Sequence, residues 1–394
     1  MKKFYNAIIV LIAFHSSEII SQDVEETIVV TSAFVDTATI TNPLYIIDGD
    51  EINDDATTSL GDAIDSYLGV SIADYGAAVG QPIIRGMSGP RVKILKNGMV
   101  NRDVSGLGVD HLNDVDLNDI QQIEIVKGPS SLLYANGTIG GIINVVDDVI
   151  SSENYELPEL KVGYESQSVN DGNSKAVNYK NNIAGFNFNF GYKDTDFGNY
   201  DVPSGAVMHE EEQHHDEDGH EEEDHDEEHH EEDMGYINNS DFEVKSTKFG
   251  VSKVADWGYI GFSMDNLESV YGIPFHGDEH EDEHGDEHGD EEEHEEHGEE
   301  RIFSTTDSES FSIKGSYDVN GNLVNKIDFN YRDSDYSLTE AHEEEEGHDE
   351  HGEEEEHEEH APTVFMNEAT EYGASLDISN DVMNQKLVFN FVDE

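Results

Sequence analysis

Two neighbouring stretches decide the fold: residues 123–134 read Ile-Glu-Ile-Val-Lys-Gly-Pro-Ser-Ser-Leu-Leu-Tyr, and residues 140–145 read Gly-Gly-Ile-Ile-Asn-Val. Each contains a run of apolar, largely β-branched residues that is typical of a buried strand, and Gly128-Pro129 separates the first run from a short helical segment. The expected order is therefore strand, helix, strand. A phosphate-binding loop needs the order strand, loop, helix N-terminus, so these glycines do not predict one.

The residues before this stretch predict the rest of a compact α+β domain over 40–150. Apolar residues at helical spacing after a Thr/Ser cap predict a helix at 58–68. Asn97-Gly98 predicts a tight hairpin turn, because both residues accept a positive φ. The other expected elements are strands at 43–47, 91–95 and 120–127, and a turn at Asp48-Gly49-Asp50.

Several motifs in this domain carry a family resemblance. In order along the chain, Ile84-Arg85-Gly86, residues 91–98 and residues 123–145 resemble the plug domain of TonB-dependent outer-membrane receptors. The resemblance implies an N-terminal plug inside a transmembrane β-barrel, located in the outer membrane of a Gram-negative bacterium. It also implies transport rather than enzymatic chemistry, no catalytic cofactor, and the TonB complex and membrane lipid as partners.

The segment upstream of the plug carries a second part of the resemblance. Glu26, Thr27, Ile28, Val29, Val30 and Thr31 resemble the TonB box of the family, within a linker at 23–39. An extended, β-branched segment adds readily as a strand to a partner's sheet edge, which is consistent with coupling to TonB. The alternative is an ordinary first strand.

The N-terminus predicts an export signal over residues 1–22. Lys2 and Lys3 form a basic start, and residues 7–14 form an apolar stretch that is too short to span a bilayer. The alternative is a buried N-terminal helix.

The rest of the chain, 158–394, predicts antiparallel barrel strands. Alternation of apolar and polar residues indicates about nine strands, at 160–166, 176–183, 186–192, 242–254, 259–266, 308–317, 324–336, 368–378 and 386–391. Short turns join them on one side and long insertions on the other, which is the asymmetry of outer-membrane barrels. Plugged transporters have about 22 strands, so we expect an incomplete barrel whose remaining strands lie beyond this sequence.

The charge of the chain is concentrated in three of these insertions. The net charge is −70, and the segments 209–233, 276–300 and 340–360 contain 44 acidic residues and no Lys or Arg. So acidic a chain is repelled by phosphate backbones, which excludes nucleic acid as a partner. Cys is absent, which excludes thiolate metal sites and disulfides.

The same three segments contain 18 of the 20 histidines. Imidazole nitrogen with carboxylate oxygen and no sulfur suits zinc, and equally nickel, cobalt or copper. The alternative is a solvated acidic loop. The candidate ligands are His209, His214, His215, His220, His225, His229, His230, His276, His280, His284, His288, His294, His297, His342, His348, His351, His357 and His360.

A further candidate pair, Asp110 and His111, follows Asp103 and the Asn-Gly hairpin in the plug. It resembles the Asp-His plug position of the zinc-uptake branch of the family, and would form half of a metal site that barrel residues complete. The alternative is a polar loop residue or a plug–barrel hydrogen bond.

Together these features predict a TonB-dependent receptor that imports a transition-metal ion. Zinc is the ion that we expect. A siderophore or haem receptor with incidental metal-binding loops is one alternative. A metal-sequestering surface protein is the other, although such a protein would not need a TonB box.

Overall fold

The computed structural model describes residues 44–54, 59–74, 78–108, 110–128, 131, 134–135, 138–204, 206, 235–274, 301–319, 321, 323–343, 362–379 and 384–394. The chain divides into two compact units, Met1–Val30 and Thr31–Glu394, and all the described residues belong to the second. The expected signal peptide and TonB box lie outside the described residues. Within the described part, no helix combines the length and the apolar character needed to cross a membrane.

The N-terminal domain is built on a five-stranded sheet in the order β1-β6-β7-β4-β5. Its strands are β1 (Leu44–Asp48), β4 (Val92–Lys96), β5 (Met99–Val100), β6 (Ile120–Lys127) and β7 (Gly141–Asp147). β6 and β7 are buried along almost their whole length, as expected from their apolar runs. The Asn97-Gly98 turn is confirmed, with φ of 54° and 81°. The expected helical segment after Gly128-Pro129 lies largely outside the described residues.

The helix expected at 58–68 is wrong. The described part of this segment contains one 3-10 turn, η2 (Asp62–Ile64), followed by β2 (Val70–Asp74), which pairs with β3 (Gly80–Ile84). Ser59 and Asp62 close the turn, because Ser59 Oγ donates to the Asp62 carboxylate and accepts from its backbone N–H. A short α-helix, α2 (Gly49–Asp54), stands where a turn was expected.

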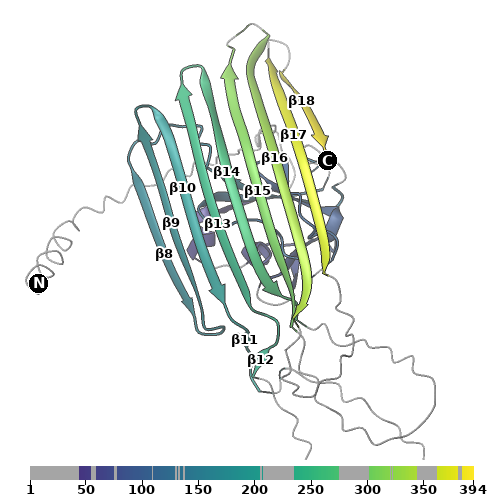
Figure 1. Ribbon diagram of the computed structural model, residues 1–394. Coiled ribbons are helices and arrows are strands. Elements are labelled where there is room, and N and C mark those ends of the chain that lie inside the picture. The colour runs from purple at the N-terminus through teal and green to yellow at the C-terminus, as the bar shows by residue number, and fades with distance from the viewer. Residues whose placement is uncertain are drawn as a thin grey trace, which may run out of the picture. The chain divides into compact units, whose positions relative to one another are not determined.

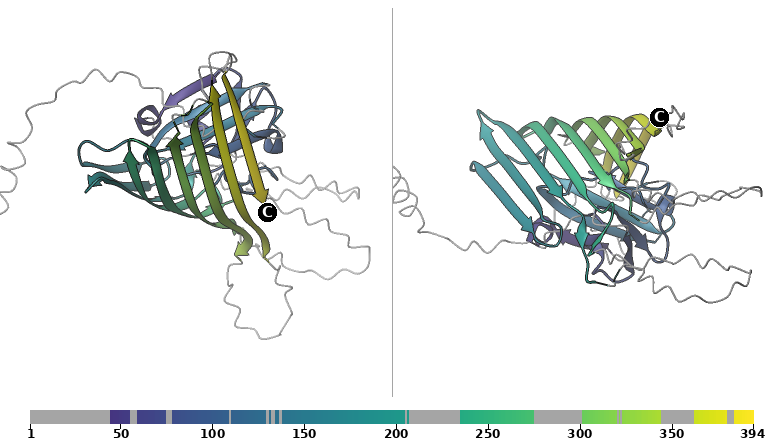
Figure 2. Two further views of the ribbon diagram at one scale, coloured as in Figure 1. Left: turned by 90° about the horizontal axis from the view of Figure 1, so that it is seen from above. Right: turned by 60° about the horizontal axis from the view of Figure 1, so that its bottom comes forward.

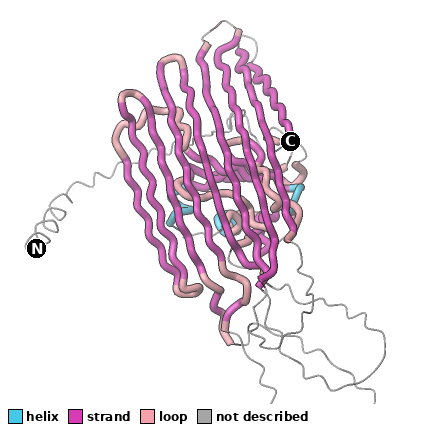
Figure 3. Tube along the Cα trace, viewed as in Figure 1, coloured by secondary structure: helices cyan, strands magenta, loops and turns pink. Residues whose placement is uncertain are grey.

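The second part of the chain forms a nine-stranded antiparallel sheet, in the order β18-β17-β16-β15-β14-β13-β10-β9-β8 (Figure 1). Figure 3 shows how little helix accompanies these strands in the described part of the chain. The strands are β8 (Glu159–Gln167), β9 (Gly172–Ile183), β10 (Phe186–Phe197), β13 (Phe242–Ala255), β14 (Gly258–Gly272), β15 (Arg301–Asp318), β16 (Val324–Glu343), β17 (Thr363–Ser379) and β18 (Asn384–Asp393). All nine expected strands are present, and most are longer than expected.

The connections between these strands follow the expected asymmetry. Short turns join β9 to β10, β13 to β14, β15 to β16 and β17 to β18 at one end of the sheet. The connections that contain the three acidic segments leave from the other end, and the short pair β11 (Tyr200–Asp201) and β12 (Tyr236–Ile237) flanks the first of them. The third segment begins within a strand, because residues 340–343 belong to β16.

The outward face of the sheet carries a continuous row of aromatic rings. Neighbouring rings lie 5.2–6.5 Å apart between centroids, and most are exposed. The row consists of Phe249, Phe262, Phe311, Tyr331, Tyr372 and Phe391. An outward apolar surface of this kind is the lipid-facing band of a transmembrane barrel.

The inward face of the sheet packs against the N-terminal domain, which lies on its concave side (Figure 2). Lys248 on β13 forms an ion pair of 2.9 Å with Asp116, and Asn178 on β9 exchanges two hydrogen bonds with Asn118. These partners belong to one loop of the N-terminal domain, residues 101–119. The same loop carries Asp110 and His111.

Candidate metal centre

One side chain, that of Gln81, holds the loop that carries Asp110 and His111. The Gln81 amide nitrogen, at the start of β3, donates to the carbonyl oxygens of Ser105, Gly108 and His111. At Gly108, an added Cβ would lie 2.2 Å from Asp110 Oδ1. Gly108 therefore allows the Asp110 carboxylate to fold back over the loop beside the imidazole.

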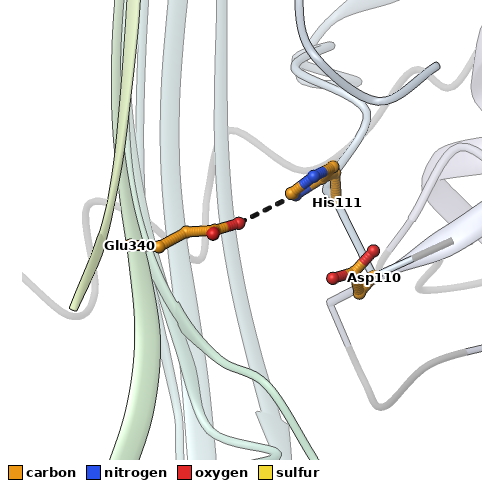
Figure 4. Close-up of side chains that lie close together, drawn as sticks. All are labelled: Asp110, His111 and Glu340. Atoms are coloured by element: carbon orange, nitrogen blue, oxygen red, sulfur yellow. Dashed lines mark ion pairs between the residues drawn. The ribbon is translucent and has the colours of Figure 1, made fainter. Parts of the chain in front are cut away.

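A barrel residue completes a three-ligand cluster with this pair. Asp110, His111 and Glu340 of β16 each offer a ligand atom, and these atoms all lie within 4.8 Å of one another (Figure 4). His111 Nδ1 lies 3.4 Å from Glu340 Oε1. Two ligands on a tetrahedral zinc ion are also about 3.4 Å apart, given bonds of about 2.1 Å. The three residues therefore approach the geometry of a zinc site, which we call the triad.

The surroundings of His111 hold the imidazole in place without occupying its Nδ1 atom. His111 is only 7% exposed, and its ring packs edge-on against Phe365 of β17 at 6.0 Å between centroids. Nδ1 makes no hydrogen bond within the described residues, despite its approach to Glu340. A buried polar atom without a partner is costly, and a bound cation would satisfy it.

The barrel wall also anchors the loop next to the triad. The backbone N–H of Leu112 donates to the hydroxyl of Tyr271 on β14, at 3.2 Å, and Tyr271 is fully buried. Because β14 and β16 both contact the loop, any movement of the plug against the wall changes the ligand geometry. The two carboxylates and one neutral imidazole of the triad carry two negative charges, which matches a divalent cation.

Three protein ligands leave a fourth position of a tetrahedral ion open. Closed four-ligand sites are typical of structural zinc, whereas an open position allows water or another ligand to enter and exchange. The ligand set contains nitrogen and oxygen but no sulfur, which suits zinc, copper, nickel or cobalt. The arrangement therefore fits an ion that is bound and later released.

Among the described residues, no other sequence candidate joins this cluster. Asp103 binds its own loop, because its carboxylate accepts from Ser105, Asn101 and the Asp114 backbone. The backbone of His342 lies in β16, paired with Ile302. The remaining candidates, His209, His214, His215, His220, His225, His229, His230, His276, His280, His284, His288, His294, His297, His348, His351, His357 and His360, lie outside the described residues.

Sequence reasoning missed Glu340, the third residue of the triad. It is the first residue of the third His/acid segment, but only the histidines of that segment were singled out. The available signal was its position on a strand. Glu340 has the same inward parity as Tyr336 and Leu338, both of which are buried.

Comparisons with known proteins agree with this fold. Residues 36–142 match the family model of the TonB-dependent receptor plug domain. A hemin receptor of Yersinia enterocolitica is 27% identical over 146 residues, which cover 36% of this chain and 20% of that receptor. The vitamin B12 transporter BtuB of Vibrio vulnificus (strain CMCP6) is 27% identical over 164 residues, which cover 40% of this chain and 26% of the transporter.

Solved structures match over a longer region. The copper transporter OprC superposes with a TM-score of 0.59 and 13% identity, over 89% of this chain and 45% of that chain. The FrpB iron transporter of Neisseria meningitidis (F3-3 variant) superposes with a TM-score of 0.58 and 12% identity, over 89% of this chain and 48% of that chain. The chain thus spans less than half the length of these solved transporters.

The class of protein follows from these matches and from the described strands. The chain combines an N-terminal plug domain with part of the wall of a transmembrane antiparallel β-barrel. More particularly, residues 36–142 match the plug domain of the TonB-dependent receptors. The named relatives are receptors and transporters.

Proposed function

We propose that the protein is a TonB-dependent importer of a transition-metal ion, and that this ion is zinc. The observation that carries the proposal is the triad, in which two plug residues and one wall residue present nitrogen and oxygen ligands around a single point. A plug–barrel site of this kind blocks the pore while the ion is bound. It opens when the plug moves.

The names of two structural neighbours support a metal cargo, since one is a copper transporter and the other an iron transporter. The three His/acid segments support a collecting role, because they concentrate metal-binding groups and negative charge on the connections at one end of the sheet. In this proposal the segments raise the local concentration of the cation, and the triad then holds one ion above the plug.

Energy for release would come from the periplasmic side. Residues 26–31 would pair with TonB as an added strand, and the pull would be passed to the plug through the linker at 23–39. Separation of the Asp110–His111 loop from β16 would remove Glu340 from the ion and weaken its binding.

The test measures uptake of radioactive zinc by cells that carry the full-length gene. We expect Asp110→Ala combined with His111→Ala, and separately Glu340→Gln, to raise the half-saturating zinc concentration by about tenfold or more, because each removes a charged or coordinating ligand. Glu309→Gln is the matched control, since Glu309 lies on neighbouring β15 but is exposed on the outward face.

Unchanged zinc uptake in both triad variants would remove the triad from the transport path. Because one of the relatives is a hemin receptor, haem is the second substrate to test in the uptake experiment. Haem uptake that survives loss of the triad, together with no zinc uptake by the wild type, would favour that alternative.

A further inference from the structure

Three inward side chains of the wall lie in one row across neighbouring strands, and one of them is a triad residue. Tyr271 of β14 is paired with Ser304 of β15, and Ser304 is paired with Glu340 of β16. Directly paired residues of antiparallel strands point to the same face, with Cβ atoms about 4.5–5.5 Å apart. Ser304 therefore stands between Tyr271 and the carboxylate that Figure 4 shows directed at His111.

The Tyr271 hydroxyl joins this row to the plug. It accepts the backbone N–H of Leu112 at 3.2 Å, and Leu112 directly follows His111. The hydroxyl also interacts with the side chain of Ser304, and the carboxylate of Glu340 acts on it electrostatically. This one hydroxyl is thus within reach of the plug backbone, of the next residue of the row and of the triad.

The ring of Tyr271 is held in place by packing from both sides. Tyr271 is fully buried and belongs to a core cluster that plug and wall build together. The plug members are Ala78 and Val79, and the wall members include Phe197 and Phe242, whose rings meet edge-on at 5.0 Å between centroids. A ring packed in this way keeps its hydroxyl at one position for as long as the plug is docked.

Ser304 is the member of the row whose hydroxyl lacks a well-formed bond. Its side chain is completely buried, and its Oγ atom makes no hydrogen bond of regular geometry within the described residues. The next inward row shows the contrast, because there the hydroxyls of Ser269 and Thr306 bond each other at 2.5 Å. Buried hydroxyls are almost always satisfied. In its own row the Ser304 hydroxyl has two polar neighbours, the hydroxyl of Tyr271 and the carboxylate of Glu340.

We propose that Tyr271 and Ser304 are positioning residues of the triad, which relay a hydrogen bond from the Leu112 backbone to the Glu340 carboxylate. This role rests on the proposed function, since the triad is there the site that binds the ion. Neither residue touches the ion. Both hold Glu340 in the position of a ligand while the plug loop is docked.

The two ends of the relay fix the direction of its hydrogen bonds. A backbone N–H can only donate and an ionised carboxylate can only accept, whereas a hydroxyl does both. With Leu112 N–H at one end and the carboxylate at the other, the Tyr271 hydroxyl donates to Ser304 and the Ser304 hydroxyl donates to Glu340. Hydrogen bonds aligned in this way strengthen one another.

The relay makes the ligand strength of Glu340 depend on plug docking. Ligating carboxylates are themselves hydrogen-bonded in metal sites, and loss of such an outer partner typically lowers metal affinity about 10–100-fold. Withdrawal of the plug loop takes the Leu112 N–H away from Tyr271, and the row loses the donor that aligns it. Glu340 then loses its fixed position as Asp110 and His111 leave, which favours release of the ion in one step.

The direct test measures zinc occupancy of the triad by anomalous diffraction, from crystals of the full-length protein soaked at graded Zn²⁺ concentrations. A peak located at the triad is not confused with ions bound by the His/acid segments. We expect Tyr271→Phe and Ser304→Ala each to raise the concentration that half-fills the triad by about tenfold or more. Ser304→Thr, which keeps the hydroxyl, should bind zinc as the wild type does.

Two control variants separate positioning from a general loss of plug docking. Tyr336→Phe removes the hydroxyl of a similarly buried tyrosine on β16, which interacts with the plug backbone at Val104 but is paired with Ser308, in a row without a triad residue. Ser316→Ala removes another buried hydroxyl of β15 that makes no regular hydrogen bond within the described residues. Both variants should keep the zinc occupancy of the wild type.

Uptake of radioactive zinc by cells gives a second readout. Because the relay acts on binding, Tyr271→Phe and Ser304→Ala should raise the half-saturating zinc concentration about tenfold and leave the maximal rate unchanged. A fall in the maximal rate with an unchanged half-saturating concentration overturns the positioning role. Equal amounts of protein in the membrane should be verified for all variants.

The outcomes distinguish this inference from the proposed function. A wild-type triad that fills with zinc, together with unchanged occupancy in Tyr271→Phe and Ser304→Ala, overturns the relay and leaves the proposed function standing. An equal loss of occupancy in the two controls also overturns the relay, because the effect is then one of plug docking. A triad that stays empty in the wild type counts against the proposed function, and the relay falls with it.

Discussion

Gln81 illustrates how one buried amide determines the geometry of a site in which it does not take part. It is 4% exposed, and its nitrogen serves three carbonyl oxygens of the loop that ends at His111. We expect Gln81→Leu to lower the zinc affinity of the triad by about tenfold, because each orphaned carbonyl costs about 1–3 kcal/mol and the loop rearranges to avoid this cost.

The effect of Gln81→Leu is measured by zinc titration of a protein in which the histidines of the three acidic segments have been substituted, so that they do not compete for zinc. Gln122→Leu is the control, since Gln122 is similarly buried and its side chain donates to Glu124 of the same strand, β6. Equal losses of affinity in the two variants would show a general effect on plug stability.

Asp114 makes the stability of the plug depend on pH. Burial raises the pKa of its carboxyl from 3.8 to about 7. A raised folded-state pKa contributes stability that is complete below about pH 4 and is lost as the pH rises through about 7. In EDTA, Asp114→Asn should therefore be more stable than the wild type at pH 8, by up to about 4 kcal/mol, and nearly equal to it at pH 4. Calorimetric unfolding at the two pH values checks this, and a difference that is independent of pH would contradict it.

The sequence singled out two of the three residues of the triad. Asp110 and His111 are adjacent, so a local motif was enough to single them out. Glu340 is separated from them by more than two hundred residues, and only the strand register, which places it inward and opposite the loop, brings it to His111. Periodicity predicts the face of a strand but not which loop faces it.

At the scale of elements, the three His/acid segments are best studied as isolated chains. We expect a synthetic 276–300 peptide to bind several Zn²⁺ ions at pH 7.5 and to release them as the pH falls through about 6–7, because a metal ligand must be neutral imidazole. Calorimetric titration measures the stoichiometry. A peptide with every His replaced by Gln is the control, and equal binding by both peptides at pH 5 would indicate simple attraction to carboxylates.

The strands were easier to predict than the small elements of the plug. Alternation along β13 to β17 is set by lipid on one face and a packed interior on the other, and this pattern is visible in sequence. The 58–68 segment has helical spacing, yet tertiary packing overrides it. Leu60, Ala63 and Ile64 enter the plug core within a single turn, and Gly69, with φ of 76°, leads directly into β2. Helical periodicity over so few residues does not distinguish a helix from a buried turn.

At the scale of the whole molecule, the central prediction concerns coupling across the membrane. Strand addition depends on backbone hydrogen bonds, and proline removes an N–H and fixes φ. Val29→Pro should therefore abolish energised zinc uptake while zinc binding to whole cells and the amount of protein in the membrane remain normal. Val29→Ala is the control, and should transport zinc. Normal uptake by Val29→Pro would favour a metal-sequestering surface protein over an importer.

The length of β16 has a consequence for where capture takes place. Its outward residues are apolar from Ile327 to Tyr331 and polar from Asp333 to Thr339, and the strand continues to Glu343. At about 3.3 Å per residue and a tilt of about 40°, its last ten residues rise roughly 25 Å above the hydrocarbon. The Debye length at physiological ionic strength is only about 8 Å. The field of the anionic lipid surface is therefore screened out where the third acidic segment begins, and cation capture there should be insensitive to headgroup composition.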